Sequence, residues 1–248
     1  MEWTAIVVAI ISAAVSLIGL RGARRTESRR AHDERALAAL EFEFKRQERL
    51  ESRSEDLAAR LDAQREPLIE AVDDLARRIE NIRHGGFLEA YVEDGDVRRR
   101  ELAVLSTLYR LGKYFAAVEM VRRGTDARAL EQHPATKGLS EAMAQVSRVL
   151  ATDEFRELMV WREEQRAMGE LLVSPASRRP IGFAEFVNRY DADFQRWFAL
   201  VHDELVRPGI AESPRLELLQ EELRELEAVL LAGRRPDVTA TGVEGSLA

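Results

Sequence analysis

Four polar residues fall on the apolar faces of predicted helices, where such side chains need a partner or a ligand. Glu119 lies near the middle of the apolar arc of a helix predicted over residues 97–123. Three more lie within the apolar arc of a helix predicted over residues 154–173: Arg162, Gln165 and Arg166. Because a buried charge is costly unless it is paired, we expect Glu119 to meet Arg162 or Arg166 in the interior. A carboxylate and a guanidinium placed there either fix how the helices pack, which is the commoner role, or bind a small anion or polar ligand.

The sequence holds few of the residues on which other chemistries depend. It has no Cys, which excludes disulfides, thiolate nucleophiles and Cys-ligated zinc. Its histidines lack the spacing of di-iron and zinc helix motifs, and neither a nucleophile elbow nor a phosphate-binding P-loop occurs in it. We therefore predict no catalytic residue, no cofactor and no metal site. The net charge of −7 lacks the positive footprint of duplex nucleic-acid binders, so we expect no nucleic-acid partner.

One enzyme pattern is present and stays open as an alternative. Helical ribonucleases of the HEPN superfamily use an arginine that is followed a few residues later by a histidine. Three pairs have this spacing: Arg78 with His84, Arg128 with His133, and Arg196 with His202. Arginine is frequent in this sequence, so such pairs also arise by chance. Arg196 and His202 are the best placed, because both lie on a helix with a clear apolar stripe.

The N-terminal residues predict a membrane anchor. Residues 3–20 carry no charge and, at about 1.5 Å per residue, span about 27 Å as a helix, just enough for a bilayer core. Arg21, Arg24 and Arg25 follow at once, so the positive-inside rule places the N-terminus outside and the bulk of the chain in the cytoplasm. Small residues at four-residue spacing would let two such helices pack closely: Ala5, Ala9 and Ala13.

A cleaved signal peptide and a buried helix of a soluble domain are the two alternatives to an anchor. A signal peptide has its positive charge before the apolar run rather than after it, although Ala14, Val15 and Ser16 resemble a cleavage site. A core helix of a soluble protein is rarely apolar on every face. Both comparisons favour a single-pass anchor over residues 1–21.

A long, charged helix is predicted after the anchor. Residues 26–65 contain no Gly and no Pro. Apolar residues recur there at heptad-like spacings, with one short step: Leu37, Leu40, Phe44, Leu50, Leu57, Leu61 and Leu68. The row is narrow and interrupted by polar residues, so this helix is too polar to be an element of a globular core. We predict a coiled-coil stalk or a spacer over residues 22–66, with a solvated helix that packs on the domain by one edge as the alternative.

Residues 67–232 predict a bundle of about five or six helices. Leu, Ala, Arg and Glu dominate the chain while Gly and Pro are sparse, which favours helix. The helices are expected over residues 67–84, 97–123, 137–151, 154–173, 182–206 and 216–230. One of them carries an aromatic stripe that is typical of a core: Phe183, Phe186, Val187, Tyr190, Phe194, Trp197, Phe198 and Val201. No alternating strand pattern of useful length occurs, so we predict an all-α fold followed by a disordered tail over residues 233–248.

Three segments resemble those of an uncharacterised group of bacterial proteins with an N-terminal membrane anchor and a helical remainder. They cover residues 106–119, 161–170 and 181–186. The resemblance extends over roughly residues 1–230 and implies the same anchored helical architecture, but it implies no activity. The frequent Arg and Ala also indicate a GC-rich bacterial genome.

The sequence favours a membrane-tethered interaction or scaffold module over an enzyme. A polar, heptad-like stalk joined to a domain with few reactive groups suits a protein that assembles with others or with itself. We expect the bilayer as one partner, further copies of the chain through anchor and stalk as another, and a protein partner of unspecified kind. The first alternative is a sensor or effector domain that binds a polar ligand at the predicted Glu119 cluster. The second is the helical ribonuclease.

Overall fold

The chain forms two compact units, residues 1–56 and 57–248. The computed structural model describes residues 40–52, 55–56, 59–124 and 134–233. The predicted anchor and all but the first residue of the predicted tail therefore lie outside the described residues. Among the described residues, no helix combines the length and the apolar character that a membrane crossing requires. In the first unit the described residues are helical, and all of their described side chains are exposed.

Every regular element described in the second unit is helical. In chain order the elements are a helix over residues 59–83, η1 (Glu89–Glu93), α2 (Val97–Gly124), α4 (Pro134–Ala151), α5 (Arg162–Leu172), α6 (Phe183–Arg189), η2 (Tyr190–Phe194), α7 (Gln195–Leu205), η3 (Ile210–Glu212) and α8 (Pro214–Ala232). Within the described residues, extended pairing is limited to an isolated bridge between Val173 and Pro180. The predicted all-α class is therefore confirmed.

The helix over residues 59–83 pairs with α2 in antiparallel fashion. Near the start of the first helix, Gln64 lies beside Gly124, the last residue of α2. Further along the first helix, Asp74 accepts a hydrogen bond from Lys113 of α2. Residue numbers thus rise on one helix as they fall on the other, which sets the register of the pair. Gly86, with a φ of 63°, adopts the left-handed conformation that lets the chain turn between the two helices.

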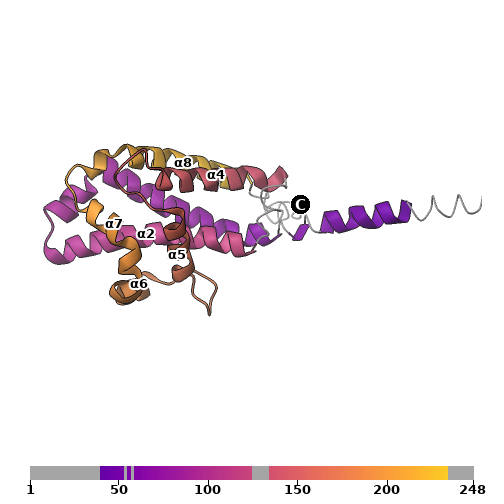
Figure 1. Ribbon diagram of the computed structural model, residues 1–248, viewed down its shortest axis with the longest axis horizontal. Helices are drawn as coiled ribbons and strands as arrows, with labels where there is room; N and C mark the ends of the chain where they lie inside the picture. Colours follow the sequence, from indigo (N-terminus) through magenta and orange to yellow (C-terminus); the bar gives the residue numbers. More distant parts are fainter. Residues whose placement is uncertain (1–39, 53–54, 57–58, 125–133, 234–248) are drawn as a thin grey trace, which may run out of the picture. The chain divides into compact units, whose positions relative to one another are not determined.

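α8 contacts the same helix from another side, and it is antiparallel as well. Arg65 Nη1 donates to the carbonyl of Leu230 at 3.1 Å, and Arg83 pairs with Glu217 at 3.1 Å. Figure 1 shows α8 and α4, which pack on each other, along one edge of this unit. The predicted apolar face of α8 is buried in the core: Leu216, Leu219, Leu223, Leu226 and Leu230. Each such side chain contributes about 1.5–3 kcal/mol through its removal from water.

The helix that contains Pro67 begins before the predicted boundary at residue 67. Pro67 starts no new helix, because the chain is helical from residue 59 to residue 83. Leu61 and Leu68, which are 4% and 0% exposed, are both part of the core. Burial of these two side chains offsets the hydrogen bond that a proline removes from a helix interior. The bundle therefore takes in residues that we had assigned to the stalk.

The helix predicted over residues 154–173 is wrong in its first half. α5 begins only at Arg162, and residues 152–161 form an irregular segment. The N–H of Trp161 donates to the carboxylate of Glu164 at 2.9 Å, as is usual at the start of a helix. Leu158 in this segment is buried. Its φ of 54° is incompatible with a right-handed α-helix, so the segment cannot be helical at this residue.

The aromatic helix predicted over residues 182–206 is confirmed, and it contains a π-helical turn. Its most buried aromatic side chains recur at every fourth residue: Phe186, Tyr190, Phe194 and Phe198. In an α-helix such a spacing drifts by about 40° at each step. The wider turn of η2 takes up part of that drift. All four rings therefore reach the core, and Phe186 contacts the other three at centroid distances of 5.0–5.8 Å.

Candidate functional site

The predicted cluster around Glu119 does not assemble as expected. Glu119 is buried, but its Oε1 accepts a hydrogen bond from Arg123 Nε at 2.8 Å, one turn along the same helix. Arg162 is exposed, and Arg166 is exposed and pairs with Glu170. The predicted pairing of Glu119 with Arg162 or Arg166 is therefore wrong. Because the residues before Arg162 are not helical, the apolar arc in which we placed the two arginines does not exist.

Gln165 is buried as predicted, and its contacts are structural. Its Nε2 donates to the carbonyls of Ser147 at 3.1 Å and Val160 at 2.9 Å, and its Oε1 accepts from the Ser147 hydroxyl at 2.7 Å. Both amide hydrogens are thus used. Gln165 connects α4, the irregular segment and α5, and it has no free donor for a ligand.

The arginine–histidine pairs of the ribonuclease alternative are not brought into contact where both members are described. His202 Nδ1 lies 3.2 Å from Asp203 Oδ1, whereas the Arg196 guanidinium stacks on the ring of Trp197. His84 is exposed, and Arg78 stacks on Phe87 instead. The third pair, Arg128 with His133, lies outside the described residues.

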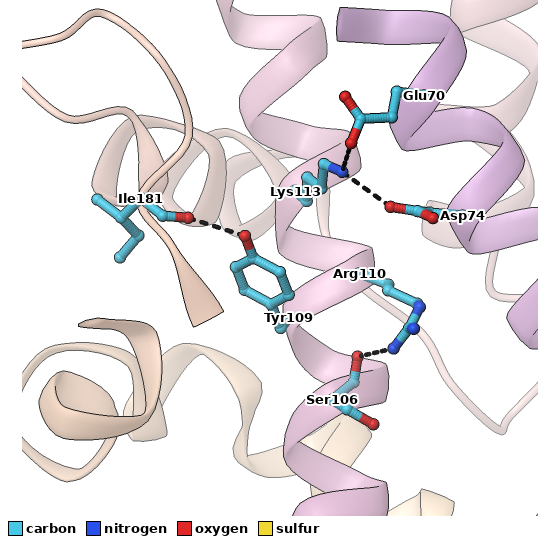
Figure 2. A network of polar contacts seen from close by, with 7 residues as sticks. All are labelled: Glu70, Asp74, Ser106, Tyr109, Arg110, Lys113 and Ile181. Atoms are coloured by element: carbon cyan, nitrogen blue, oxygen red, sulfur yellow. Dashed lines mark hydrogen bonds and ion pairs between the residues drawn. The ribbon is translucent and has the colours of Figure 1, made fainter. Parts of the chain in front are cut away.

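A different group of polar residues lies where the helix over residues 59–83 meets α2, and we call it the polar strip. It consists of Glu70, Asp74 and Arg78 from the first helix and Tyr109, Arg110 and Lys113 from α2. Figure 2 shows five of its members, all except Arg78. The sequence carries a signal for the strip, which is the four-residue spacing of Glu70, Asp74 and Arg78 that places them on one face of a helix.

Lys113 occupies the middle of the strip, between two carboxylates. Its Nζ donates to Glu70 Oε1 at 2.7 Å and to Asp74 Oδ2 at 2.8 Å. The side chain of Lys113 is 15% exposed, so most of it is withdrawn from water. Burial opposes its charge, but the hydrogen bonds to Asp74 and Glu70 outweigh that effect, and the pKa of Lys113 is raised. The ammonium therefore stays charged and ties the two helices together.

Tyr109 extends the strip toward the start of α6. Its hydroxyl donates to the carbonyl of Ile181 at 2.9 Å, and its ring lies against Phe183 and Phe186. Burial raises the pKa of Tyr109, with the nearby Lys113 acting in the opposite direction. A phenol that is already donating and held neutral orients the chain before α6 and is a poor general base at neutral pH.

Arg78 and Arg110 lie next to Lys113 in the strip, and their charges are not balanced. No carboxylate lies within ion-pair distance of either guanidinium in the part of the chain that the structure describes. Arg78 is 9% exposed and stacks on Phe87 with 3.8 Å between Cζ and the ring centroid. Arg110 Nη1 donates to the carbonyl of Ser106 at 3.1 Å. Of the six residues in the strip, these two arginines have cationic groups that remain available for a ligand.

Comparison of the chain with models of known families, with curated proteins and with solved structures finds no match.

Replacing Lys113 with Met is expected to lower the free energy of unfolding by about 1 kcal/mol, measured by urea denaturation. The substitution leaves Glu70 and Asp74 as like charges one helical turn apart. Because the pKa of Lys113 is raised on folding, its ion pairs contribute fully to stability at every pH below the ordinary pKa of lysine. The loss of unfolding free energy in the variant should therefore be constant around neutral pH. It should shrink as the pH rises through the folded-state value.

Lys137 provides a matched control for this measurement. Its ammonium lies 3.7 Å from Glu141 on the same helix, and both side chains are more than 60% exposed. Lys137→Met should therefore change stability by less than about 0.5 kcal/mol. Equal losses in the two variants would contradict a special role for Lys113.

Proposed function

We propose that the protein is a membrane-tethered helical module that associates with further copies of itself through residues 40–52. The supporting observation is a row of exposed apolar side chains on this helix. Leu40 and Phe44 are 66% and 71% exposed and lie on one face of the helix, about 40° apart. Leu50, which is 57% exposed, flanks that face about 80° from Leu40. Large apolar side chains grouped in this way usually mark an interaction surface. A helix that is otherwise polar gains stability when a second helix covers such a row.

The N-terminal residues support the membrane tether. Residues 3–20 are uncharged and are followed by arginines, as in a single-pass helix with its C-terminal end in the cytoplasm. A tether confines copies of the chain to one plane in parallel orientation, which raises their effective concentration. A short row can therefore suffice for association, whereas the same helix free in solution would bind weakly.

The charges beside the row influence which partner fits. Glu43 precedes Phe44 and Glu48 follows Gln47, so they occupy the positions that flank the row. In a parallel pair of copies, Glu43 of one helix lies near Glu48 of the other, and the like charges weaken the pair by a few tenths of a kcal/mol. Association with itself is thus expected to be reversible and to strengthen when these charges are removed.

Light scattering of the full chain in detergent micelles tests the proposal. The wild-type chain is expected to form a discrete oligomer, and the double variant Leu40→Gln with Phe44→Gln is expected to be mostly monomeric. Phe42→Gln is the matched control, because Phe42 is 68% exposed but lies on the opposite side of the helix. Replacement of Glu43 and Glu48 with Gln should strengthen association about two-fold or more.

Two outcomes would contradict the proposal. A wild-type chain that is monomeric at every concentration rules out self-association. Weaker association after removal of Glu43 and Glu48 would contradict the parallel register in which these two residues face each other.

A further inference from the structure

Arg78 is a buried cation without a counter-charge, and such a group is rare in a folded protein. Its Nη1 is fully buried and has no hydrogen-bond partner among the described residues. Transfer of a guanidinium out of water is costly unless an anion and hydrogen-bond acceptors replace the water. The ring of Phe87 at 3.8 Å supplies a cation–π contact, which accepts no hydrogen bond from the guanidinium edge.

The register of the two helices places a second cation opposite the first. Lys113 meets Asp74, and the helices are antiparallel, so the residue one turn after Asp74 faces the residue about one turn before Lys113. These residues are Arg78 and Arg110. Burial, helped by the nearby charge of Arg110, lowers the pKa of Arg78 to about 10. Both groups still carry their charge at neutral pH, so the helices hold two guanidiniums together.

The neighbouring acids do not neutralise this pair. Asp74 is the carboxylate one turn before Arg78 on the same face of the helix, and it accepts a hydrogen bond from Lys113. Arg110 is half-buried and its single described hydrogen bond goes to a backbone carbonyl, so it keeps free N–H donors on the solvent side. Tyr91, which is 47% exposed, packs on Phe87 and forms the outer rim beside Arg78.

We propose that Arg78 and Arg110 form a binding site for a phosphate-type oxyanion, with Phe87 as its inner wall. Two guanidiniums that come from different helices match a tetrahedral anion, which offers oxygens in several directions, better than a planar carboxylate. A phosphate monoester carries close to two negative charges at neutral pH and so balances two arginines. The phosphate group belongs either to a soluble molecule or to a lipid headgroup. This site goes beyond the proposed self-association and does not depend on it.

Thermal unfolding of the full chain in nanodiscs of zwitterionic lipid tests the site, with inorganic phosphate as the probe. Phosphate at ten times its Kd should raise Tm by about 3–6 °C, while chloride at equal ionic strength should not. A second arm replaces part of the lipid with phosphatidic acid and omits phosphate. A rise in Tm in the first arm alone identifies a soluble ligand, and a rise in the second alone identifies a lipid headgroup.

Arg110→Gln is the decisive variant, because Arg110 is half-buried and its loss leaves the core intact. It should weaken binding at least about ten-fold, as expected when one charged hydrogen-bond donor is lost. Arg77→Gln is the matched control, since Arg77 lies beside Arg78 in the chain but is exposed and paired with Asp73. Arg78→Met should abolish the shift while leaving the anion-free Tm unchanged or higher, because a buried unpaired charge is removed.

The site is overturned if neither phosphate nor phosphatidic acid raises Tm. It is equally overturned if Arg77→Gln weakens binding as much as Arg110→Gln, which would mean that the anion responds only to overall charge.

Discussion

Replacing Arg215 with Met is expected to lower the free energy of unfolding by about 3–5 kcal/mol. Arg215 lies in the first turn of α8 and is 0% exposed. Its guanidinium donates to four backbone carbonyls, one in the last turn of α4 and three in the segment that follows it: Val149, Thr152, Phe155 and Glu157. Met fills a similar volume but donates no hydrogen bond, so the substitution isolates the loss of these contacts.

A residue of another helix, α7, also forms a hydrogen bond with the irregular segment that Arg215 contacts. Glu204 of α7 is 4% exposed and accepts the backbone N–H of Leu158. Burial lowers the pKa of Arg215, and the charges of Glu204 and Glu157 act against that shift. Carbonyl groups of the segment therefore accept hydrogen bonds from the Arg215 guanidinium, and one of its N–H groups donates to the Glu204 carboxylate. Loss of Arg215 should release residues 152–161 first, and hydrogen exchange should show this before global unfolding.

Two variants make this measurement specific. Arg224→Met removes an exposed arginine of the same helix, which pairs with Glu80 at 2.7 Å, and should change stability by less than about 1 kcal/mol. Arg215→Lys should restore little, because an ammonium cannot reach four carbonyls that diverge around a planar guanidinium. A loss for Arg215→Met no larger than that for Arg224→Met would show that the four hydrogen bonds contribute nothing net.

The spacing of apolar residues was sufficient to predict those helices whose backbone hydrogen bonds are formed within the helix itself. The apolar face of α8 follows helical periodicity, and its buried residues agree with it. The segment before α5 also shows apolar residues at helical spacing, yet it is irregular. Its backbone partners are Arg215 and Glu204, which lie more than 40 residues further along the chain. A local pattern carries no information about partners at that separation.

The candidate site was predictable in part, for the same reason. The helical wheel placed Glu119 in the core correctly, but its partner Arg123 is the arginine one turn ahead rather than one on another helix. The same reasoning applied to charges on apolar faces would have singled out Arg78, which follows Leu75 and precedes Ile79 and Ile82. That Arg110 faces it follows only from the register of two helices, which the sequence does not specify.

Replacing Gly169 with Ala is expected to lower the free energy of unfolding by about 2 kcal/mol, although Ala favours helix over Gly. Gly169 lies in α5 where this helix crosses α2. A Cβ atom there would lie 2.7 Å from the carbonyl oxygen of Phe115 and 3.3 Å from Cβ of Glu119. The nearest atom belongs to the backbone of a long helix, so the contact is relieved only if the two helices separate.

Gly138 of α4 provides the opposite case within the same chain. No atom lies within 4 Å of a Cβ built there, so Gly138→Ala should raise stability by up to about 1 kcal/mol through helix propensity alone. Urea denaturation of both variants, monitored by tryptophan fluorescence, separates the steric contact at Gly169 from the gain in helix propensity. If both substitutions stabilise the protein, α5 and α2 are less closely packed than the distance to Phe115 implies. If they act in opposite directions, the crossing at Gly169 fixes the position of Glu119 and of the helix that carries Arg110 and Lys113.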